Sequence, residues 1–227
     1  FCFNKKTNKK ISALILVHVF GYPSEILKIK KICNKFKIIL IEDAAEGIGS
    51  YYNGRHLGTF GKFGILSFNG NKTITTGGGG ALLTNEKKIA RIARSLSTTG
   101  KKPHAWKYEY DAVAYNYRLP NINSALGIAQ LKNLNKILKA KKKLYLKYNS
   151  ELKKLTDIKF FEEPKFSKSN FWLNTILIKK SSIKKRDLIL KVINNAGIQI
   201  RPCWRLLHRL KHFSNYPRMN LEIAEKL

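Results

Sequence analysis

Three side chains that could act together in chemistry lie near apolar runs in the first third of the sequence. Asp43 comes just after the run Ile38–Ile41, Ser67 lies in the run Phe63–Phe68, and Lys72 follows Ser67 by five residues. A carboxylate can keep a ring nitrogen protonated, an amine can condense with an aldehyde, and a hydroxyl can bind a phosphate. Pyridoxal phosphate chemistry needs these three groups. The residues therefore predict a pyridoxal phosphate site, with Lys72 catalytic and Asp43, Ser67 and Lys72 binding the cofactor.

Glycines on both sides of Lys72 narrow the kind of loop that it occupies. The run Gly77–Gly80 lets the backbone adopt positive φ or pass close to a flat ring. A phosphate-binding P-loop does not fit, because Asn71 separates Gly70 from the lysine. A dinucleotide-binding fingerprint does not fit either, because the glycine run leads into the apolar stretch Ala81–Leu83 and not into a helix.

Each of these residues also has an ordinary interpretation. Asp43 could cap a strand end or the following turn, and Ser67 could be a plain strand-end serine. Lys72 is one of many lysines in the chain. The chemical interpretation depends on their order and on the elements that position them.

The first such element is a strand, helix and strand that place Asp43. The continuous apolar run Ile11–Val19 predicts a buried strand, and the turn Gly21–Ser24 ends in a serine that could cap a helix over Glu25–Phe36. With the strand Ile38–Ile41 this makes a right-handed βαβ unit of parallel strands. Ligands of such sheets bind beyond the carboxyl ends of the strands, where Asp43 falls.

The rest of the chain is expected to complete a large domain and to begin a small one. In the large domain the patterns predict a loop at Ser50–Gly61, strands at Phe63–Phe68 and Ala81–Leu83, and a helix at Glu86–Leu96. Irregular structure is expected from Thr98 to Pro120, followed by one long helix or a broken pair from Asn121 to Leu155. The small domain is expected to contain the segments Phe160–Phe161, Phe171–Ile178 and Ile198–Cys203 and a helix from Lys184 to Asn195 closed by Gly197. We expect residues 1–135 to be part of a large cofactor-binding domain. Residues 136–227 are expected to form a connecting helix and an incomplete small C-terminal α/β domain.

Composition limits the partners. Lys and Arg number 44 against 14 acidic residues, a formal charge of +30 that would suit nucleic acid or an anionic membrane. The lysines are spread along every expected helix and do not alternate with aromatic residues on one face, so we expect neither partner. The longest apolar stretch, Ile11–Phe20, is too short to span a bilayer. Three widely spaced cysteines and five dispersed histidines predict no metal site, and they fit a reducing cytoplasm.

Longer segments add a resemblance to this chemistry. Ile41–Glu46 and Ser67–Lys72, together with Val17–Gly21, Gly58–Lys62 and Tyr115–Asn123, resemble the sugar aminotransferases of the DegT/DnrJ/EryC1/StrS family. The resemblance covers essentially the whole chain. It implies a fold type I pyridoxal phosphate-dependent transferase, with part of the large domain's mixed sheet and a small C-terminal α/β domain.

The resemblance also implies roles and partners. Glu46 takes the position near the cofactor ring and substrate, and Asn116 reaches the cofactor phosphate of the neighbouring subunit, so that a homodimer shares its active sites. The implied reaction moves an amino group, with glutamate as donor, to a nucleotide diphosphate keto sugar. Phe1 in place of methionine and Leu227 within an amphipathic run lead us to expect a fragment lacking both ends. Its N-terminal phosphate cradle would then lie outside the sequence.

Some finer features point to one branch of the family. Pro103–Trp106, Arg201–Trp204 and Tyr216–Arg218 look most like the branch that aminates 4-keto-6-deoxy nucleotide sugars on the way to legionaminic acid. Ala114 departs from that branch, which usually has glycine there. Two alternatives stay open. One is a pyridoxal-dependent sugar dehydratase of the same family, in which histidine replaces the lysine, and the other is a non-catalytic basic binding protein on the same scaffold.

Overall fold

The computed structural model describes residues 1–179 and 183–226. The chain divides into two compact units. The first unit contains Phe1–Phe3, Lys10–Lys147 and Glu162–Asn174, and the second contains Asn4–Lys9, Tyr148–Phe161 and Thr175–Leu227. Each unit is described by itself below.

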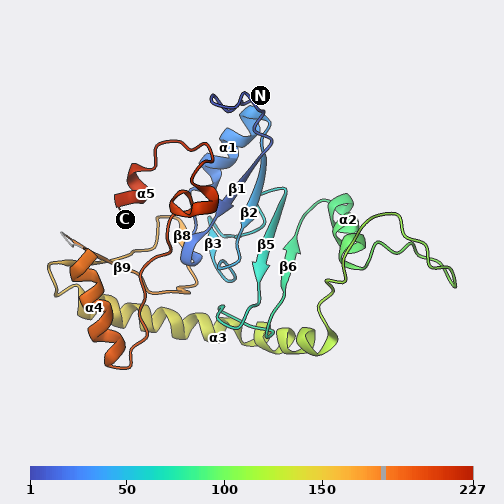
Figure 1. Cartoon of the computed structure of the whole chain (residues 1–227). Coiled ribbons are helices and arrows are strands. Elements are labelled where there is room, and N and C mark those ends of the chain that lie inside the picture. The colour runs from blue at the N-terminus through green and yellow to red at the C-terminus, as the bar shows by residue number, and fades with distance from the viewer. Residues whose placement is uncertain (180–182, 227) are drawn as a thin grey trace. The chain divides into compact units, whose positions relative to one another are not determined.

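A four-stranded mixed sheet forms the centre of the first unit (Figure 1). Its strands are β1 (Ala13–Val17), β2 (Ile39–Asp43), β5 (Phe63–Ser67) and β6 (Gly80–Leu83), in the order β1-β2-β5-β6. The first three run parallel and β6 pairs antiparallel with β5. The predicted parallel βαβ unit and the α/β class with a mixed sheet are confirmed.

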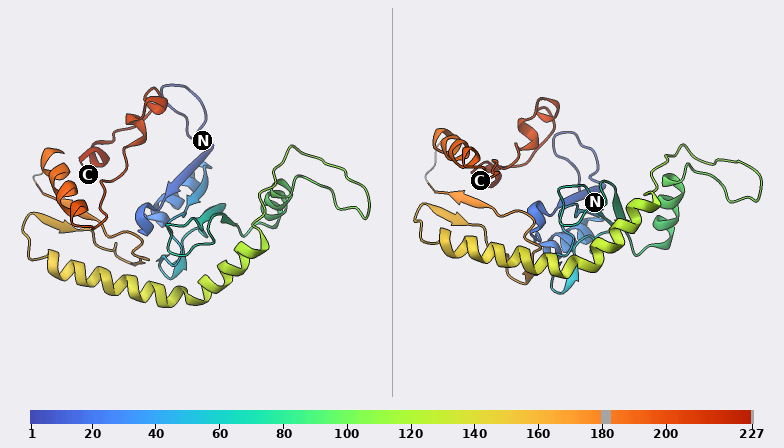
Figure 2. Two further views of the ribbon diagram at one scale, coloured as in Figure 1. Left: turned by 60° about the horizontal axis from the view of Figure 1, so that its bottom comes forward. Right: turned by 90° about the horizontal axis from the view of Figure 1, so that it is seen from below.

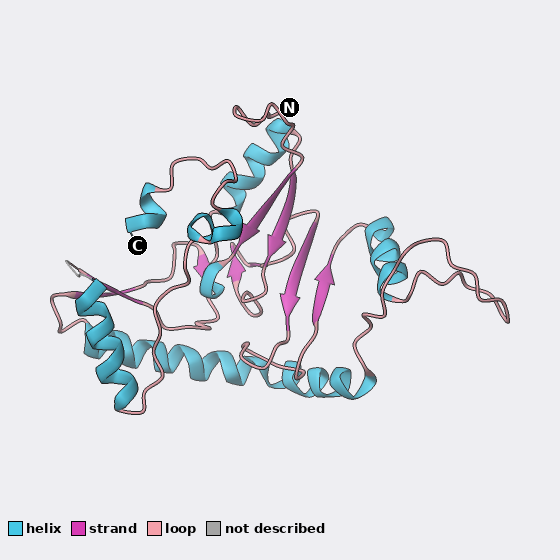
Figure 3. Ribbon diagram, in the orientation of Figure 1, coloured by secondary structure: helices cyan, strands magenta, loops and turns pink. Residues whose placement is uncertain are grey.

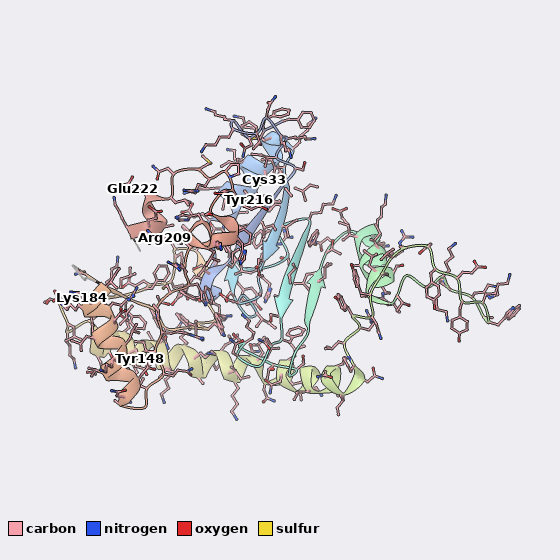
Figure 4. The ribbon with its side chains drawn as sticks, in the orientation of Figure 1. Cys33, Tyr148, Lys184, Arg209, Tyr216 and Glu222 are labelled. Carbon is pink, nitrogen blue, oxygen red and sulfur yellow. The ribbon has the colours of Figure 1, made fainter. Side chains whose placement is uncertain are left out.

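One face of this sheet packs on helix α1 (Ile26–Phe36), which joins β1 to β2 after the short 3-10 turn η1 (Val19–Gly21). Because side chains alternate along a strand, every second residue of β2 and β5 reaches this core. Ile26 and Cys33 of α1 are almost fully buried there, against Leu40 and Leu66 of the sheet. Figure 4 labels Cys33 on this helix.

Helix α1 begins differently from the prediction. The Ser24 side chain donates to the carbonyl of Val17, and Glu25 takes the position before the helix without a side-chain cap. The predicted serine cap is therefore wrong, because the hydroxyl ties the turn back to the end of β1 instead. The helix ends at Lys37 in the left-handed region, with φ of 55°.

The remaining elements of the first unit are a second small sheet, one shorter helix and most of a long helix. The predicted loop 50–61 contains two short strands, β3 (Tyr51–Tyr52) and β4 (Arg55–His56), which form a second sheet with β8 (Ser167–Lys168) in the order β4-β3-β8. Helix α2 (Lys87–Ser97) leads into residues 98–120, a long loop that extends away from the sheet (Figure 3). Helix α3 (Asn121–Leu152) is one unbroken helix (Figure 2), which decides between the two alternatives for that region.

The second unit holds a small hairpin and short helices. Strands β7 (Ile158–Phe160) and β9 (Ile176–Ile178) pair antiparallel. Helix α4 (Ile183–Asn195) is followed by Gly197 at φ of 78°, as predicted for a terminating glycine. The turns η2 (Leu207–Arg209) and η3 (Lys211–Phe213) and helix α5 (Glu222–Lys226) complete it.

Two expected segments of this region differ from the prediction. The run Phe171–Ile178, expected in the small domain, is a strand only over Ile176–Ile178, and Phe171, at a φ of 49°, belongs to the first unit. Ile198–Cys203 has no regular structure, since the backbone of Ile200 bonds the side chain of Asn194 and not a neighbouring strand. The domain boundary at residue 135 falls within α3 and stays a prediction. No helix within residues 1–179 and 183–226 is both long and apolar enough to cross a membrane.

Candidate active site

The predicted residues gather where the parallel strands end. Asp43 is the last residue of β2 and Ser67 is the last residue of β5. Asp43 pairs with Ile65, and Ser67 lies two positions beyond Ile65, so the side chains of Asp43 and Ser67 project from the same face of the sheet. This face is opposite to the one that packs on α1. The carboxylate and the hydroxyl therefore share one edge and one side of the sheet.

Asp43 is fixed by the turn that follows it. Its Oδ1 accepts a hydrogen bond from the amide of Ala45 at 3.1 Å, and its carbonyl accepts one from the amide of His18 at 3.1 Å. The second bond ties the end of β2 to the chain leaving β1. Asp43 thus has the strand-end position that the sequence predicted.

Lys72 lies against Glu46 and an indole ring. Its Nζ is 3.4 Å from Oε1 of Glu46, and the two side chains are only 13% and 11% exposed. The same Nζ stands 4.3 Å from the ring centroid of Trp172. Glu46 in turn accepts a hydrogen bond from the amide of Phe20 at 2.7 Å. The lysine amine is therefore held in a partly enclosed place, between an anion and an aromatic face.

The charges around Glu46 connect three of the predicted residues. Burial raises the pKa of the Glu46 carboxyl, while the Phe20 amide and the Lys72 ammonium lower it and the Asp43 carboxylate raises it. The net pKa lies above the usual value for glutamate. Asp43, Glu46 and Lys72 are thus close enough to influence one another, and Glu46 takes up a proton more readily than an exposed glutamate.

Ser67 lies at the start of the turn that contains Lys72. Its Oγ accepts the amide of Asn69 at 3.3 Å in the turn that leads to Lys72. The amide of Lys72 donates to the carbonyl of Asn69 at 3.0 Å, which closes this turn. One tight turn therefore connects the hydroxyl to the amine.

Asn116 lies apart from this group. It forms an isolated bridge with Thr98 in the long loop 98–120. The structure therefore brings together Asp43, Glu46 and Lys72, places Ser67 on the same face, and leaves Asn116 in a separate loop.

Sequence reasoning missed Asn170, which binds the loop beneath the site. Asn170 is fully buried, and its Nδ2 donates to the carbonyls of Glu46 at 2.6 Å and Ile48 at 2.9 Å. Its Oδ1 accepts the amide of Trp172 at 2.9 Å. An asparagine followed by the two aromatic residues Phe171 and Trp172 was the available signal, but the prediction gave Phe171–Ile178 only as a segment of the small domain.

Sequence reasoning also missed the partners of Glu42, the residue before Asp43. Glu42 points to the opposite face, where it is fully buried. It accepts the amides of Gly58, Phe60 and Gly61 and lies 3.2 Å from Nε2 of His18. This buried carboxylate fixes the loop after β4 and the turn after β1 to the end of β2. It therefore supports the strand end that presents Asp43.

The donor set fits pyridoxal phosphate. A largely buried primary amine, a carboxylate at a strand end and a serine hydroxyl on the same face of the sheet match the cofactor's aldehyde, ring nitrogen and phosphate. Within residues 1–179 and 183–226, no three His, Cys, Asp or Glu side chains cluster as metal ligands would.

Comparisons with known proteins agree with this chemistry. Residues 3–227 match the family described as the DegT/DnrJ/EryC1/StrS aminotransferase family. A GDP-perosamine synthase of Vibrio cholerae is 35% identical over 215 residues, which are 93% of this chain and 57% of the synthase.

Solved structures share the fold. Helicobacter pylori PseC, an aminotransferase involved in the biosynthesis of pseudoaminic acid, has a TM-score of 0.87 at 24% identity, covering 94% of this chain and 58% of its own. An E. coli GDP-4-keto-6-deoxy-D-mannose-3-dehydratase with bound hydrated PLP has a TM-score of 0.77 at 26% identity, covering 84% and 53%. The chain thus spans little more than half the length of these proteins. The predicted fold of pyridoxal phosphate-dependent transferases is confirmed.

Proposed function

Because this chain belongs to the DegT/DnrJ/EryC1/StrS aminotransferase family, we propose that the whole protein transfers an amino group to a nucleotide-linked 4-keto-6-deoxy sugar. Glutamate is the proposed donor and the 4-amino sugar the product. The observation that supports this most directly is the Lys72 amine, enclosed between Glu46 and Trp172 beside the strand end that carries Asp43.

Each residue has one proposed task toward the family's cofactor, pyridoxal phosphate. The cofactor supplies an aldehyde that accepts the amino group and a ring that withdraws electrons. Lys72 would hold that aldehyde through its Nζ, and the freed Nζ would serve as the base and acid that moves a proton at the substrate carbon. Asp43 keeps the ring nitrogen protonated, Ser67 binds the phosphate, and Glu46 contacts the ring hydroxyl or the substrate.

The homodimer is proposed to complete the site with Asn116 of the neighbouring subunit. The support is the position of Asn116 in a loop that extends from its own sheet, with exposed Tyr115 and Tyr117 on either side. A loop so rich in exposed aromatic residues is suited to pack on another chain.

The finer substrate and the compartment are proposals as well. A precursor of legionaminic acid is the proposed keto sugar, supported by the segments Pro103–Trp106 and Arg201–Trp204. An arginine such as Arg201 could pair with the diphosphate through two hydrogen bonds. The cytoplasm is the proposed compartment, supported by the unpaired cysteines Cys2, Cys33 and Cys203.

The experiment is an assay of the whole protein on a panel of nucleotide-linked keto sugars with nitrogen-15 glutamate. We expect one 4-keto-6-deoxy sugar to gain the labelled nitrogen, and the Lys72→Ala variant to lose this transfer. The Lys62→Ala variant is the matched control, because Lys62 is an exposed lysine of the same unit. Absence of labelled sugar from the whole panel would contradict the proposal.

A dehydratase is the second candidate, favoured by the 26% identity with the E. coli dehydratase. The same assay separates the two reactions by product mass, because a dehydratase removes a hydroxyl from the sugar and leaves no labelled nitrogen on it. Lysine at position 72 favours amino transfer.

A further inference from the structure

Trp172 contacts both the amine and the backbone turn of Lys72, although the two residues are far apart in the sequence. We propose that Trp172 is a positioning residue for Lys72, a role that rests on the proposed function. It belongs to the segment Ser169–Trp172, which is buried throughout and is part of the first unit.

The two contacts lie at opposite ends of the lysine. The indole face is 4.3 Å from Nζ, so the ammonium sits on the negative face of the ring. The indole Nε1 donates to the carbonyl of Asn71 at 2.7 Å, in the peptide just before Lys72. The Trp172 side chain therefore fixes both the backbone just before Lys72 and the position of the Lys72 Nζ.

Trp172 is itself held from several directions. Its amide donates to Oδ1 of Asn170 at 2.9 Å, and its carbonyl accepts Nζ of Lys141 from α3 at 3.2 Å. Its ring lies 6.5 Å from that of Phe20, centroid to centroid. Only 6% of the residue is exposed. A side chain so restrained can transmit its position to the flexible stem of Lys72.

Holding the stem matters because a free lysine samples many rotamers. An attraction between the ammonium and a desolvated ring offsets the entropy lost when the four-carbon stem is fixed. Glu46 alone would attract the amine from one side without fixing the turn. The amine that must meet the cofactor aldehyde is thus aligned by a residue from the part of the chain after α3.

Two variants separate the contacts. Trp172→Phe keeps an aromatic face and loses the Nε1 hydrogen bond, whereas Trp172→Leu loses both. Trp204→Phe is the matched control, because Trp204 is half-exposed and belongs to the second unit. If the leucine variant does not fold, the phenylalanine variant decides alone.

Three measurements on the whole protein test the positioning. In the cofactor-free protein, we expect Trp172→Phe to speed hydrogen exchange in residues 69–73, and Trp204→Phe to leave it unchanged. In stopped flow with pyridoxal phosphate, covalent capture at Lys72 should slow about tenfold in Trp172→Leu, the order of one desolvated cation–π contact, and less in Trp172→Phe. In amino transfer, kcat should fall while KM for the keto sugar stays the same.

The outcomes distinguish this proposal from the proposed function. If both variants capture the cofactor at the wild-type rate, or exchange in residues 69–73 does not change, the positioning role is wrong. A lower melting temperature with normal capture would make Trp172 a purely structural residue and would also overturn it. If the wild-type protein never captures the cofactor at Lys72, the proposed function fails, and the exchange measurement still decides whether Trp172 holds the turn.

Discussion

The buried carboxylate of Glu42 should be essential to the strand end that presents Asp43, and Glu42→Gln tests this. Oε1 of Glu42 accepts the amides of Phe60 at 2.6 Å and Gly61 at 2.7 Å. Oε2 accepts the amide of Gly58 at 2.8 Å and lies 3.2 Å from His18 Nε2. Each oxygen therefore faces two donors.

The magnitude follows from this geometry. A glutamine has one oxygen and one NH₂ group, so whichever way the amide turns, two of the four hydrogen bonds are replaced by donors facing donors. Leaving buried donors unpaired at a site that held a charge costs about 3–5 kcal/mol. We expect the free energy of unfolding of Glu42→Gln to fall by that amount at neutral pH.

The pH dependence has a definite sign. Burial alone raises the pKa of Glu42, but the hydrogen bonds from His18, Gly61 and Gly58 outweigh it and hold the pKa below the ordinary value. Stability from this carboxylate is therefore complete above its unfolded pKa, about 4.3. It is lost as the pH falls through the lower folded pKa. The free energy of unfolding of the wild type should therefore fall as the pH is lowered from the unfolded pKa of Glu42 through its folded pKa. Glu42→Gln has no carboxylate to titrate at this position and should not show this fall.

Urea denaturation at pH 7 and at decreasing pH, followed by circular dichroism of the whole protein, measures both effects. Glu25→Gln is the control, because Glu25 is 60% exposed and pairs with Lys28 on the surface of α1. We expect the control to unfold at the wild-type midpoint. Equal midpoints for Glu42→Gln and Glu25→Gln at pH 7 would show that the Glu42 carboxylate does not stabilise this strand end.

Three further predictions follow from the same structure. Gly21 has a φ of 79°, and an added Cβ would collide with Oδ1 of Asn170, so Gly21→Ala should lower the free energy of unfolding by about 3 kcal/mol in urea denaturation. The control Gly54→Ala has a φ of 75° and nothing within 4 Å of the added Cβ, so it should lower it by about 1 kcal/mol. Equal losses in the two variants would contradict the role of Asn170. The variants Lys72→Ala and Asn116→Ala should each lose amino transfer alone. When they are refolded together, part of the amino transfer should return, since one site of each mixed dimer then has both native residues. No recovery would argue against a shared site. Filter binding over a salt series should show no strong DNA affinity that falls steeply with salt, and such affinity would favour the non-catalytic basic binding protein.

The strands and helices near Asp43 were predictable because their patterns are local. The apolar run at β1 and the helical spacing along α3 indicate a strand and a helix from nearby residues alone. The prediction of a buried strand at β1 is nevertheless wrong, because Ile15 and Val17 are exposed on one face. The end of β2 also placed Asp43 correctly, since parallel strands present their carboxyl ends at one edge. These features required no knowledge of distant residues.

The support of the site was not predictable in the same way. Trp172 reaches Lys72 from a segment beyond α3, and this segment was expected in the small domain although it belongs to the first unit. Glu42 was passed over for its neighbour Asp43, although alternation along β2 sends the two side chains to opposite faces. A charge turned to the buried face needs partners, and those partners come from other segments.

The proposed function requires that the cofactor bind covalently to Lys72. The direct measurement is to incubate the whole protein with pyridoxal phosphate, reduce it with borohydride, digest it, and locate the modified lysine by mass spectrometry. We predict a single main adduct on the peptide that contains Lys72, absent from Lys72→Ala and retained in Lys62→Ala. An adduct on another lysine, with the Lys72 peptide unmodified, would contradict the account.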